Sequence, residues 1–401
     1  MLTPPEAEQV IRENLSLLPS EDCPLSQALG RILRAPIAAD RDMPPFDRVT
    51  MDGYALRSEA LTAGVRSFQV SGMQAAGMMP LTLEQEDGAI EIATGATLPK
   101  GADCVVPYEE VQREGTTVRI ASTAAITSGA NVHRRASDHV AGSPLIPSGT
   151  VLSGREIAVA AACGAATVRV TMIPRIAVVA TGDELAEVEA VSIAPHQIRR
   201  SNDRALEAGL QAAGYSRVER FHVRDVRPEI VNALQRIMTE FDVLILTGGI
   251  SKGKFDYLPG VLSQLSVAKK FQGVAQRPGK PFWFGITSKN TPVFALPGNP
   301  VSTYTCFCRY VLPALAQMSG AIAKEPEYAV LAEAVVFKPK LACLLPVAVK
   351  TRPDGVCHAQ PLATNTSGDL AGLLGTTGFV ELPPGDTTFP KGTVARYWAW
   401  R

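Results

Sequence analysis

The sequence has no excess charge of either sign and no long apolar run. Lys and Arg together number 39, and so do Asp and Glu, which makes the formal net charge zero. A balanced chain lacks the bulk positive charge of a nucleic-acid-binding surface, so any anion site must be local. No stretch reaches the roughly 18 uninterrupted apolar residues of a membrane span, and the N-terminus lacks the pattern of a signal peptide. We therefore expect a cytoplasmic protein with neither a nucleic-acid nor a membrane partner.

Cysteine and histidine are too scattered for a disulfide framework or a zinc centre. The seven cysteines are odd in number and include no CxxC pair. Cys306 and Cys308 are two residues apart in an expected helix, so they point to different faces and cannot chelate one ion together. The five histidines form no i,i+4 pair on a recognisable helix. This usage suits core cysteines in a reducing compartment.

The chain has 401 residues, of which 46% are hydrophobic and 19% are charged. This length and composition predict several globular domains. Thr3, with Glu6 three residues later, predicts a capped helix over 3–18, and a short second helix is expected within 24–33. The expected domains are a discontinuous elongated domain (1–46 and 140–172), a β-rich inserted domain (47–139), an α/β domain (173–325) and a C-terminal small β-barrel domain (326–401).

Unbroken apolar runs indicate strands that are covered on both faces, as in a parallel sheet. RIAVVATGDEL begins at residue 175, and further strands are expected at VERFHV, DVLILTGG and VFAL. They alternate with expected helices at 203–213, 227–240, 257–265 and 301–318. This alternation predicts a central three-layer, doubly wound α/β domain.

Ligands of such sheets bind beyond the carboxyl ends of the strands, so the loops that leave those ends carry the candidate site. TGGISKGKFD follows one strand, and its glycines leave backbone amides open to a phosphate, although a plain β-to-α connection has the same pattern. Glu184, Asp225 and Asp256 follow three different strands. Carboxylates that converge in this way repel one another unless a cation or a proton joins them, which favours a divalent metal.

Two further motifs allow both a structural and a functional interpretation. QRPGKPFWFG places Arg277 and Lys280 around a Pro-Gly turn, which is either a solvated hairpin tip or a fixed cationic site for a small oxyanion. FDRVTMDGYALR places Asp52 before a glycine, as in an ordinary turn. The prolines at 44 and 45 stiffen the chain ahead of it, so this carboxylate can also be held for a ligand.

Six motifs in fixed order carry a resemblance to a known family. MDGYA, ATGATLPKGADCVV, VVATGDEL, TGGISKGKFDY, RPGKPFWFG and ALPGNPVS are spread over residues 46–302. Together they resemble the MoeA family, the molybdopterin molybdenumtransferases that include the gephyrin E domain. The β-rich tail fits the family's last domain in position, so the resemblance covers essentially the whole chain.

The resemblance implies an enzyme that takes adenylated molybdopterin and molybdate, releases AMP and inserts the metal, assisted by a divalent cation such as Mg2+. It also implies a homodimer with a cleft shared between subunits, and possible partners in a molybdopterin adenylyltransferase and in recipient molybdoenzymes. The implied catalytic residues are Asp52, Thr94, Asp138, Glu184, Asp225 and Asp256, of which the last three are also metal ligands. The implied cofactor-binding residues are Thr181, Gly182, Gly248, Gly249, Ser251, Arg277, Lys280, Pro297, Gly298, Asn299 and Ser302.

The sequence departs from the family pattern at several places. Arg48-Val49-Thr50 replaces the usual Asn-Ser-Ala, HRRASD (133–138) replaces a stretch with glycine and glutamate, and Lys254 stands where many members have an acid. FKPKLACLLPV also lacks the basic pattern of the family's last domain. The alternatives are an adenylyltransferase, which resembles the α/β domain alone, and a non-catalytic scaffold module.

Overall fold

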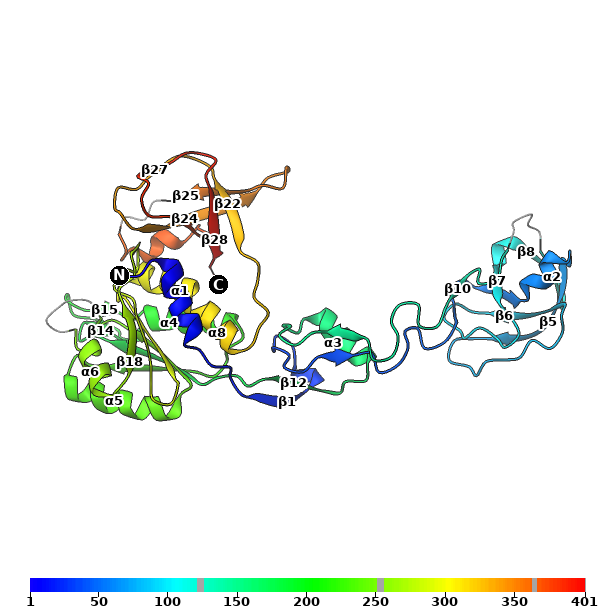
Figure 1. Ribbon diagram of the computed structural model, residues 1–401, viewed down its shortest axis with the longest axis horizontal. Coiled ribbons are helices and arrows are strands. Elements are labelled where there is room, and N and C mark those ends of the chain that lie inside the picture. The colour runs from blue at the N-terminus through cyan, green and yellow to red at the C-terminus, as the bar shows by residue number, and fades with distance from the viewer. Residues whose placement is uncertain (121–125, 251–255, 363–365, 401) are drawn as a thin grey trace. The chain divides into compact units, whose positions relative to one another are not determined.

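A computed structural model describes residues 1–120, 126–250, 256–362 and 366–400 (Figure 1). The chain divides into two compact units. The first unit comprises Met1–Arg34, Ser148–Ser153 and Val168–Arg401, and the second comprises Ala35–Pro147 and Gly154–Thr167. The four domain boundaries expected from the sequence remain predictions.

A six-stranded sheet forms the centre of the first unit. Its spatial order is β16 (Val218–Val223), β13 (Ile176–Thr181), β17 (Val243–Thr247), β21 (Pro292–Leu296), β20 (Trp283–Ile286) and β18 (Ala268–Gln272). The first four strands are parallel. At one edge, β20 pairs antiparallel with β21, and β18 pairs antiparallel with β20. Every residue of β13, β17 and β21 is buried, as their unbroken apolar runs predict.

Helices cover both faces of this sheet, because successive strand residues point to opposite sides. Ile176 and Val178 pack with residues of α1 (Pro4–Glu13), α4 (Asn202–Ala212) and α8 (Leu312–Met318), whereas Ala177 and Val179 pack with α5 (Arg227–Glu240) and α6 (Leu258–Gln264). Figure 1 shows these two groups of helices on opposite sides of the sheet. The expected three-layer α/β architecture is confirmed.

A π-helical turn, η3 (Phe307–Val311), separates α7 (Pro300–Cys306) from α8. It directly precedes the first turn of α8, where Pro313 has no N–H to donate to the carbonyl of residue 309. The turn carries Arg309, whose side chain is fully buried and contacts Glu8 and Glu381, each at 2.8 Å. Its guanidinium also lies 4.2 Å from the ring centre of Trp398. Arg309 thereby joins α1, the α/β layer and the C-terminal strands.

The C-terminal strands close into a five-stranded barrel. Its members are β22 (Glu327–Leu331), β24 (Ala342–Thr351), β25 (Cys357–Pro361), β26 (Gly378–Leu382) and β28 (Val394–Ala399). The ring closes because β24 pairs with both β25 and β26, while β22 pairs with both β25 and β28. Minor elements are β19 (Gln276–Arg277), β23 (Val335–Val336), β27 (Thr388–Phe389), η4 (Leu370–Leu373), β14 (Leu185–Ala186) and β15 (Ile198–Arg199). This barrel is the expected small C-terminal β domain.

The second unit is built on another six-stranded sheet. Its order is β7 (Cys104–Pro107), β4 (Gly53–Leu56), β6 (Gly88–Ile92), β5 (Ser67–Gln74), β9 (Thr117–Ile120) and β8 (Val111–Glu114). The unit also contains α2 (Ser58–Thr62), η2 (Tyr108–Glu110), and two short strand pairs, namely β2 (Ile37–Ala38) with β11 (Pro144–Ile146) and β3 (Arg48–Val49) with β10 (Val132–His133). It further contains α3 (Gly154–Ala162). In the first unit, β1 (Ser20–Pro24) pairs with β12 (Thr167–Thr171). The second helix, expected within residues 24–33, is only a short helical turn, η1 (Leu25–Gln27).

Gly53 begins β4 and has a steric role that the turn interpretation of Asp52-Gly53 did not anticipate. A Cβ at Gly53 would lie 2.0 Å from the carbonyl oxygen of Val106 on the neighbouring strand. Glycine is therefore needed for close backbone approach between β4 and β7. Asp52 lies just before this strand, so its carboxylate is carried by the end of a buried sheet element.

Candidate functional site

The four parallel strands of the first unit end level with one another. Thr181 pairs with Val223, Ala180 pairs with Thr247, and Thr247 pairs with Leu296. The loops that follow β13, β16, β17 and β21 therefore emerge along one edge of the sheet. These loops carry Glu184, Asp225, Asp256 and the segment Pro297–Ser302, so the structure brings these predicted residues to a common edge.

The turn that carries Arg277 and Lys280, the cationic turn, lies at the same edge because β18 runs in the direction of the parallel strands and β20 runs back against them. Trp283, the first residue of β20, pairs with Ala295 near the end of β21, and with Gln272 at the end of β18. The connection between β18 and β20 thus leaves the sheet at the carboxyl edge. It contains Arg277 and Lys280, which are exposed and form no ion pair with another described residue.

The backbone of the cationic turn is fixed by packing. Gly279 has a φ of +94°, and a Cβ there would lie 2.4 Å from the sulfur of Cys306. Gln276 is buried and accepts a hydrogen bond from the hydroxyl of Tyr310. The two cations therefore project from a turn whose main chain is held against α7 and η3.

Glycines let two loops approach each other closely. Gly248 and Gly249 have φ values of +88° and +61°, and a Cβ on Gly248 would lie 2.6 Å from the carbonyl oxygen of Thr181. A Cβ on Gly298 would lie 3.5 Å from the Cα of Gly248. The hydroxyl of Thr181 is buried at this junction without a hydrogen-bond partner among the described residues. Such an unpaired hydroxyl beside glycine-rich backbone suits an oxyanion.

Carboxylates cluster next to this junction. Gly182 has a φ of +150°, and a Cβ there would lie 2.6 Å from a carboxylate oxygen of Glu184. The backbone N–H of Asp225 donates to Asp183 at 3.3 Å. Partial burial, followed by the negative charges of Glu184, Asp183 and Asp256, raises the pKa of Asp225 above its ordinary value. The three predicted metal ligands are therefore close enough to interact electrostatically. Asp183, which was not predicted, belongs to the same cluster.

No preformed metal centre accompanies this cluster. In the part of the chain that the structure describes, no group of three or more Asp, Glu, His or Cys side chains is placed to hold a metal ion. The carboxylates are nevertheless oxygen donors of the kind that Mg2+ prefers. Ser251 and Lys254, which the sequence analysis singled out, lie outside the described residues.

The loop after β21 is braced from two sides. Asn202, at the start of α4, donates to the carbonyl oxygen of Gly298 at 2.7 Å. Asn299 donates to the hydroxyl of Ser367 at 2.7 Å, and the N–H of Val301 donates to the Ser367 carbonyl at 3.1 Å. Ser302 is 4% exposed within α7. Neither Asn202 nor Ser367 was predicted. Both lie far along the chain from the loop that they contact, so no sequence pattern connects them with it.

The predicted residues of the second unit form two small hydrogen-bonded groups. The carboxylate of Asp52 accepts from the backbone N–H of Thr94 at 2.7 Å and from its hydroxyl at 2.9 Å. These two bonds, the backbone bond first, lower the pKa of Asp52. Asp138 instead contacts His133, at 2.9 Å. The structure therefore pairs Asp52 with Thr94, and it pairs Asp138 with His133.

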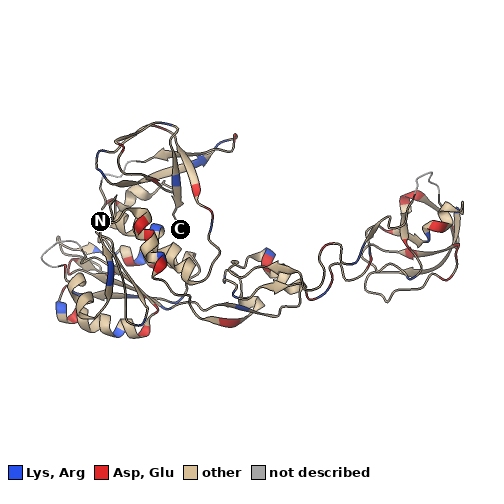
Figure 2. Ribbon diagram, viewed as in Figure 1, with Lys and Arg blue, Asp and Glu red and all other residues tan. Residues whose placement is uncertain are grey.

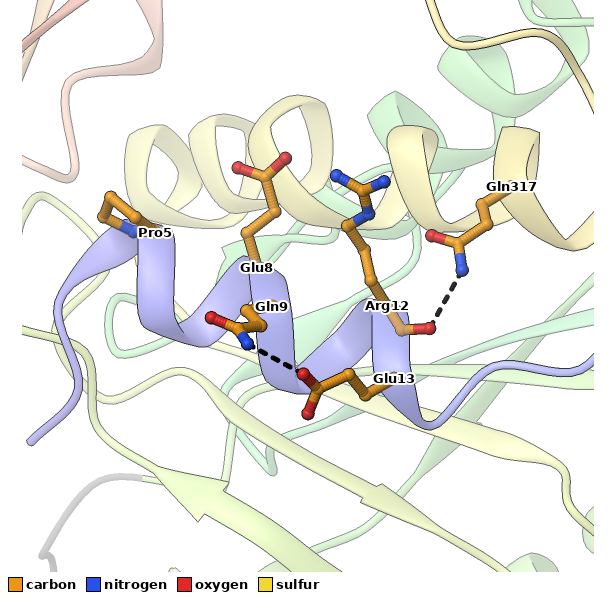
Figure 3. Close-up of a pocket in the computed structure, with 6 residues that line it drawn as sticks. All are labelled: Pro5, Glu8, Gln9, Arg12, Glu13 and Gln317. Carbon is orange, nitrogen blue, oxygen red and sulfur yellow. Dashed lines mark hydrogen bonds between the residues drawn. The ribbon is translucent and has the colours of Figure 1, made fainter.

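A hollow of about 600 Å³ lies elsewhere on the first unit, between α1 and α8. Figure 3 shows Glu8, Gln9, Arg12 and Glu13 projecting from α1 beside Gln317. Gln317 donates to the carbonyl oxygen of Arg12 at 2.9 Å, and Gln9 donates to Glu13 at 2.8 Å. None of the residues that line this hollow is a predicted site residue.

These features define an α/β protein with a β-barrel attached at the edge where its parallel strands end. Models of the MoeA N-terminal region (domain I and II), a probable molybdopterin binding domain and the MoeA C-terminal region (domain IV) match residues 2–164, 177–317 and 328–400. The chain belongs to the MoeA family, as its motifs predicted.

Individual relatives match most of this chain and most of their own length. A molybdopterin molybdenumtransferase of Synechocystis is 41% identical over 372 residues, which cover 92% of this chain and 93% of the relative. One from Staphylococcus epidermidis is 32% identical over 377 residues, covering 92% and 88%. A crystal structure of the MoeA protein from Pyrococcus horikoshii aligns with a TM-score of 0.84 at 26% identity and covers all of both chains.

No described helix is long and apolar enough to cross a membrane. Figure 2 shows Lys and Arg interspersed with Asp and Glu along the ribbon, in line with the equal totals of the two signs.

Proposed function

We propose that the chain is a molybdopterin molybdenumtransferase, which takes adenylated molybdopterin and molybdate, releases AMP and inserts molybdenum, the final step of molybdenum cofactor biosynthesis. The observation that carries this proposal is the meeting of an acidic cluster, a glycine-rich junction and a cationic turn at one sheet edge. Relatives that carry this enzyme name over more than nine-tenths of the chain support it.

Each part of the edge has a proposed role. Thr181, Gly182, Gly248, Gly249 and Ser251 bind the phosphates through backbone N–H groups and hydroxyls. Arg277 and Lys280 bind molybdate, since fixed cations make charge-assisted hydrogen bonds to a small dianion. The remaining cofactor-binding residues are Pro297, Gly298, Asn299 and Ser302.

Glu184, Asp225 and Asp256 are the proposed ligands of Mg2+, and their oxygen donors fit a hard divalent cation. When bound there, Mg2+ would neutralise charge on the phosphate that is cleaved. Without it, the ligands repel one another, and this repulsion adds to partial burial, the larger cause, in raising the pKa of Asp225. Asp52, Thr94 and Asp138 are the further proposed catalytic residues. A homodimer, an adenylyltransferase and recipient molybdoenzymes are the proposed partners.

The test is molybdate-dependent release of AMP from adenylated molybdopterin in the presence of Mg2+ and the absence of ATP. A molybdenumtransferase releases AMP only when molybdate is added. An adenylyltransferase would instead consume ATP and molybdopterin, and a scaffold would do neither. Absence of release by the purified chain would overturn the proposal.

Replacing Arg277 or Lys280 with alanine is expected to raise the molybdate concentration for half-maximal AMP release. A lost bond to a charged group is worth roughly 1.5–3 kcal/mol, so the shift is about tenfold or more for each variant. The affinity for adenylated molybdopterin should hardly change. Lys289→Ala, in the turn between β20 and β21, is the control, because that turn lies at the opposite edge of the sheet. Equal weakening of both substrates would assign this turn to the nucleotide.

Asp52→Asn is expected to lower AMP release at least tenfold while leaving the fold intact. Asparagine keeps an oxygen that can accept both bonds from Thr94, so the substitution removes mainly the negative charge. AMP release and circular dichroism of the same sample test this. Glu86→Gln, an exposed carboxylate of the same unit, should match the wild type. Wild-type turnover by Asp52→Asn would remove Asp52 from the catalytic residues.

A further inference from the structure

Three side chains of the second unit form a continuous hydrogen-bonded array. Arg48 on β3 and His133 on β10 are direct partners in an antiparallel pair, so their side chains lie on the same face. Nη2 of Arg48 lies 3.1 Å from Nδ1 of His133, and Nε2 of the same ring lies 2.9 Å from Oδ1 of Asp138. The imidazole therefore bridges a guanidinium and a carboxylate.

The chemistry of the two ends determines where the ring carries its proton. A guanidinium has only donors, so Nδ1 must accept from Arg48. A neutral ring then has its hydrogen on Nε2, where it can donate to the carboxylate of Asp138. The array selects the Nε2–H tautomer, and it leaves His133 without a free ring nitrogen.

Hydrogen bonds fix the backbone around Asp138. The orientation of its carboxylate therefore depends on the contact with the His133 ring. The N–H of Asp138 donates to the Met43 carbonyl at 2.9 Å, and the N–H of Ala136 donates to that of Pro44 at 3.0 Å. Ala136 has a φ of +61°, which marks a tight turn. The side chain of Asp138 is half exposed, and rotation about its side-chain bonds would break the contact with His133.

We propose that His133 is a positioning residue that orients the carboxylate of Asp138 for the reaction, and that Arg48 fixes the tautomer of His133. The inference about the reaction rests on the proposed function, whereas the tautomer does not. Arg48 and His133 belong to the two stretches of this unit that depart from the family pattern, and the structure places these two side chains in contact.

Activity tests the positioning role through a conservative variant. His133→Ala is expected to lower kcat for AMP release about tenfold or more, since a misoriented catalytic group costs up to about 10²-fold, with KM for molybdate unchanged. His133→Gln should recover most of the loss, because its amide can accept from Arg48 and donate to Asp138. His139→Ala, another histidine of this unit, should match the wild type. Wild-type kcat in His133→Ala, or no recovery in His133→Gln, overturns the positioning role.

Nitrogen NMR of the full chain, labelled in its five histidines, tests the array without activity. His133 of the wild type should show the Nε2–H tautomer at neutral pH, and Arg48→Met should shift the Nδ1 resonance of His133, because Nδ1 then loses its hydrogen bond. An Nδ1–H ring or an imidazolium in the wild type overturns the array. If the wild type releases no AMP, the proposed function fails, and the NMR result still decides whether the array exists.

Discussion

Replacing Arg309 with methionine is expected to lower the free energy of unfolding of the first unit by about 3–5 kcal/mol, the usual cost of breaking a buried ion pair. The guanidinium is fully buried between Glu8 and Glu381. Its removal leaves two carboxylates that lose their cation, and it also removes the cation–π contact with Trp398. Urea unfolding followed by tryptophan fluorescence measures the effect, because Trp283, Trp398 and Trp400 all belong to this unit.

A compensating variant distinguishes the ion network from simple packing. Replacing Glu8 and Glu381 with leucine together with Arg309→Met should recover much of the lost stability, since apolar groups of similar size can replace buried ions. Arg396→Met is the matched control, because that arginine contacts Glu8 only at 3.7 Å and is about one-third exposed. A small loss in Arg309→Met, or no recovery in the triple variant, would contradict this account of the network.

The α/β layer could be predicted in detail because a strand that is buried on both faces has an unbroken apolar run in the sequence. VERFHV matches β16, and the helix expected at 227–240 matches α5. The strands β18 and β20 were not predicted. AKKFQ of β18 is mostly exposed and lacks an apolar run. WFGI of β20 is buried throughout, but it is only four residues long and was interpreted as part of the Pro-Gly turn motif. The expected helix over 24–33 is only the turn η1, since Ile32 and Leu33 instead make bridges to Val151 and Val170. Tertiary pairing there outweighs helix propensity.

The candidate site could likewise be predicted only in part. The meeting of Glu184, Asp225 and Asp256 follows from one rule, that parallel strands end at a common edge, and it needs no knowledge of side-chain contacts. Asn202 and Ser367 contact the loop after β21 from positions 96 and 68 residues away along the chain. His133 likewise meets Arg48 across 85 residues. Single contacts of this kind have no period, so the sequence alone could not reveal them.

Crowding among the carboxylates is expected to lower the stability of the folded protein through Asp225. Burial and the charges of Glu184, Asp183 and Asp256 raise its pKa in the folded state above that in the unfolded state. The folded protein therefore binds more protons between these two values, so stability falls as the pH rises through this window, and the loss persists above it. Below both values, Asp225 is protonated and resembles asparagine in charge.

Asp225→Asn is accordingly expected to raise the melting temperature in chelator, by more at pH 8 than at pH 4. The same variant should lower Mg2+-dependent AMP release by about 100-fold, which is the upper range for loss of a supporting group at a metal site. Added Mg2+ should stabilise the wild type more than the variant, because the ion offsets a repulsion that the variant lacks. Asp386→Asn, an exposed carboxylate on the barrel, should change neither quantity. Thermal melts at both pH values and AMP release over a Mg2+ titration measure these effects. If Asp225→Asn keeps wild-type turnover with the same Mg2+ dependence, the acidic edge is structural and the metal assignment is wrong.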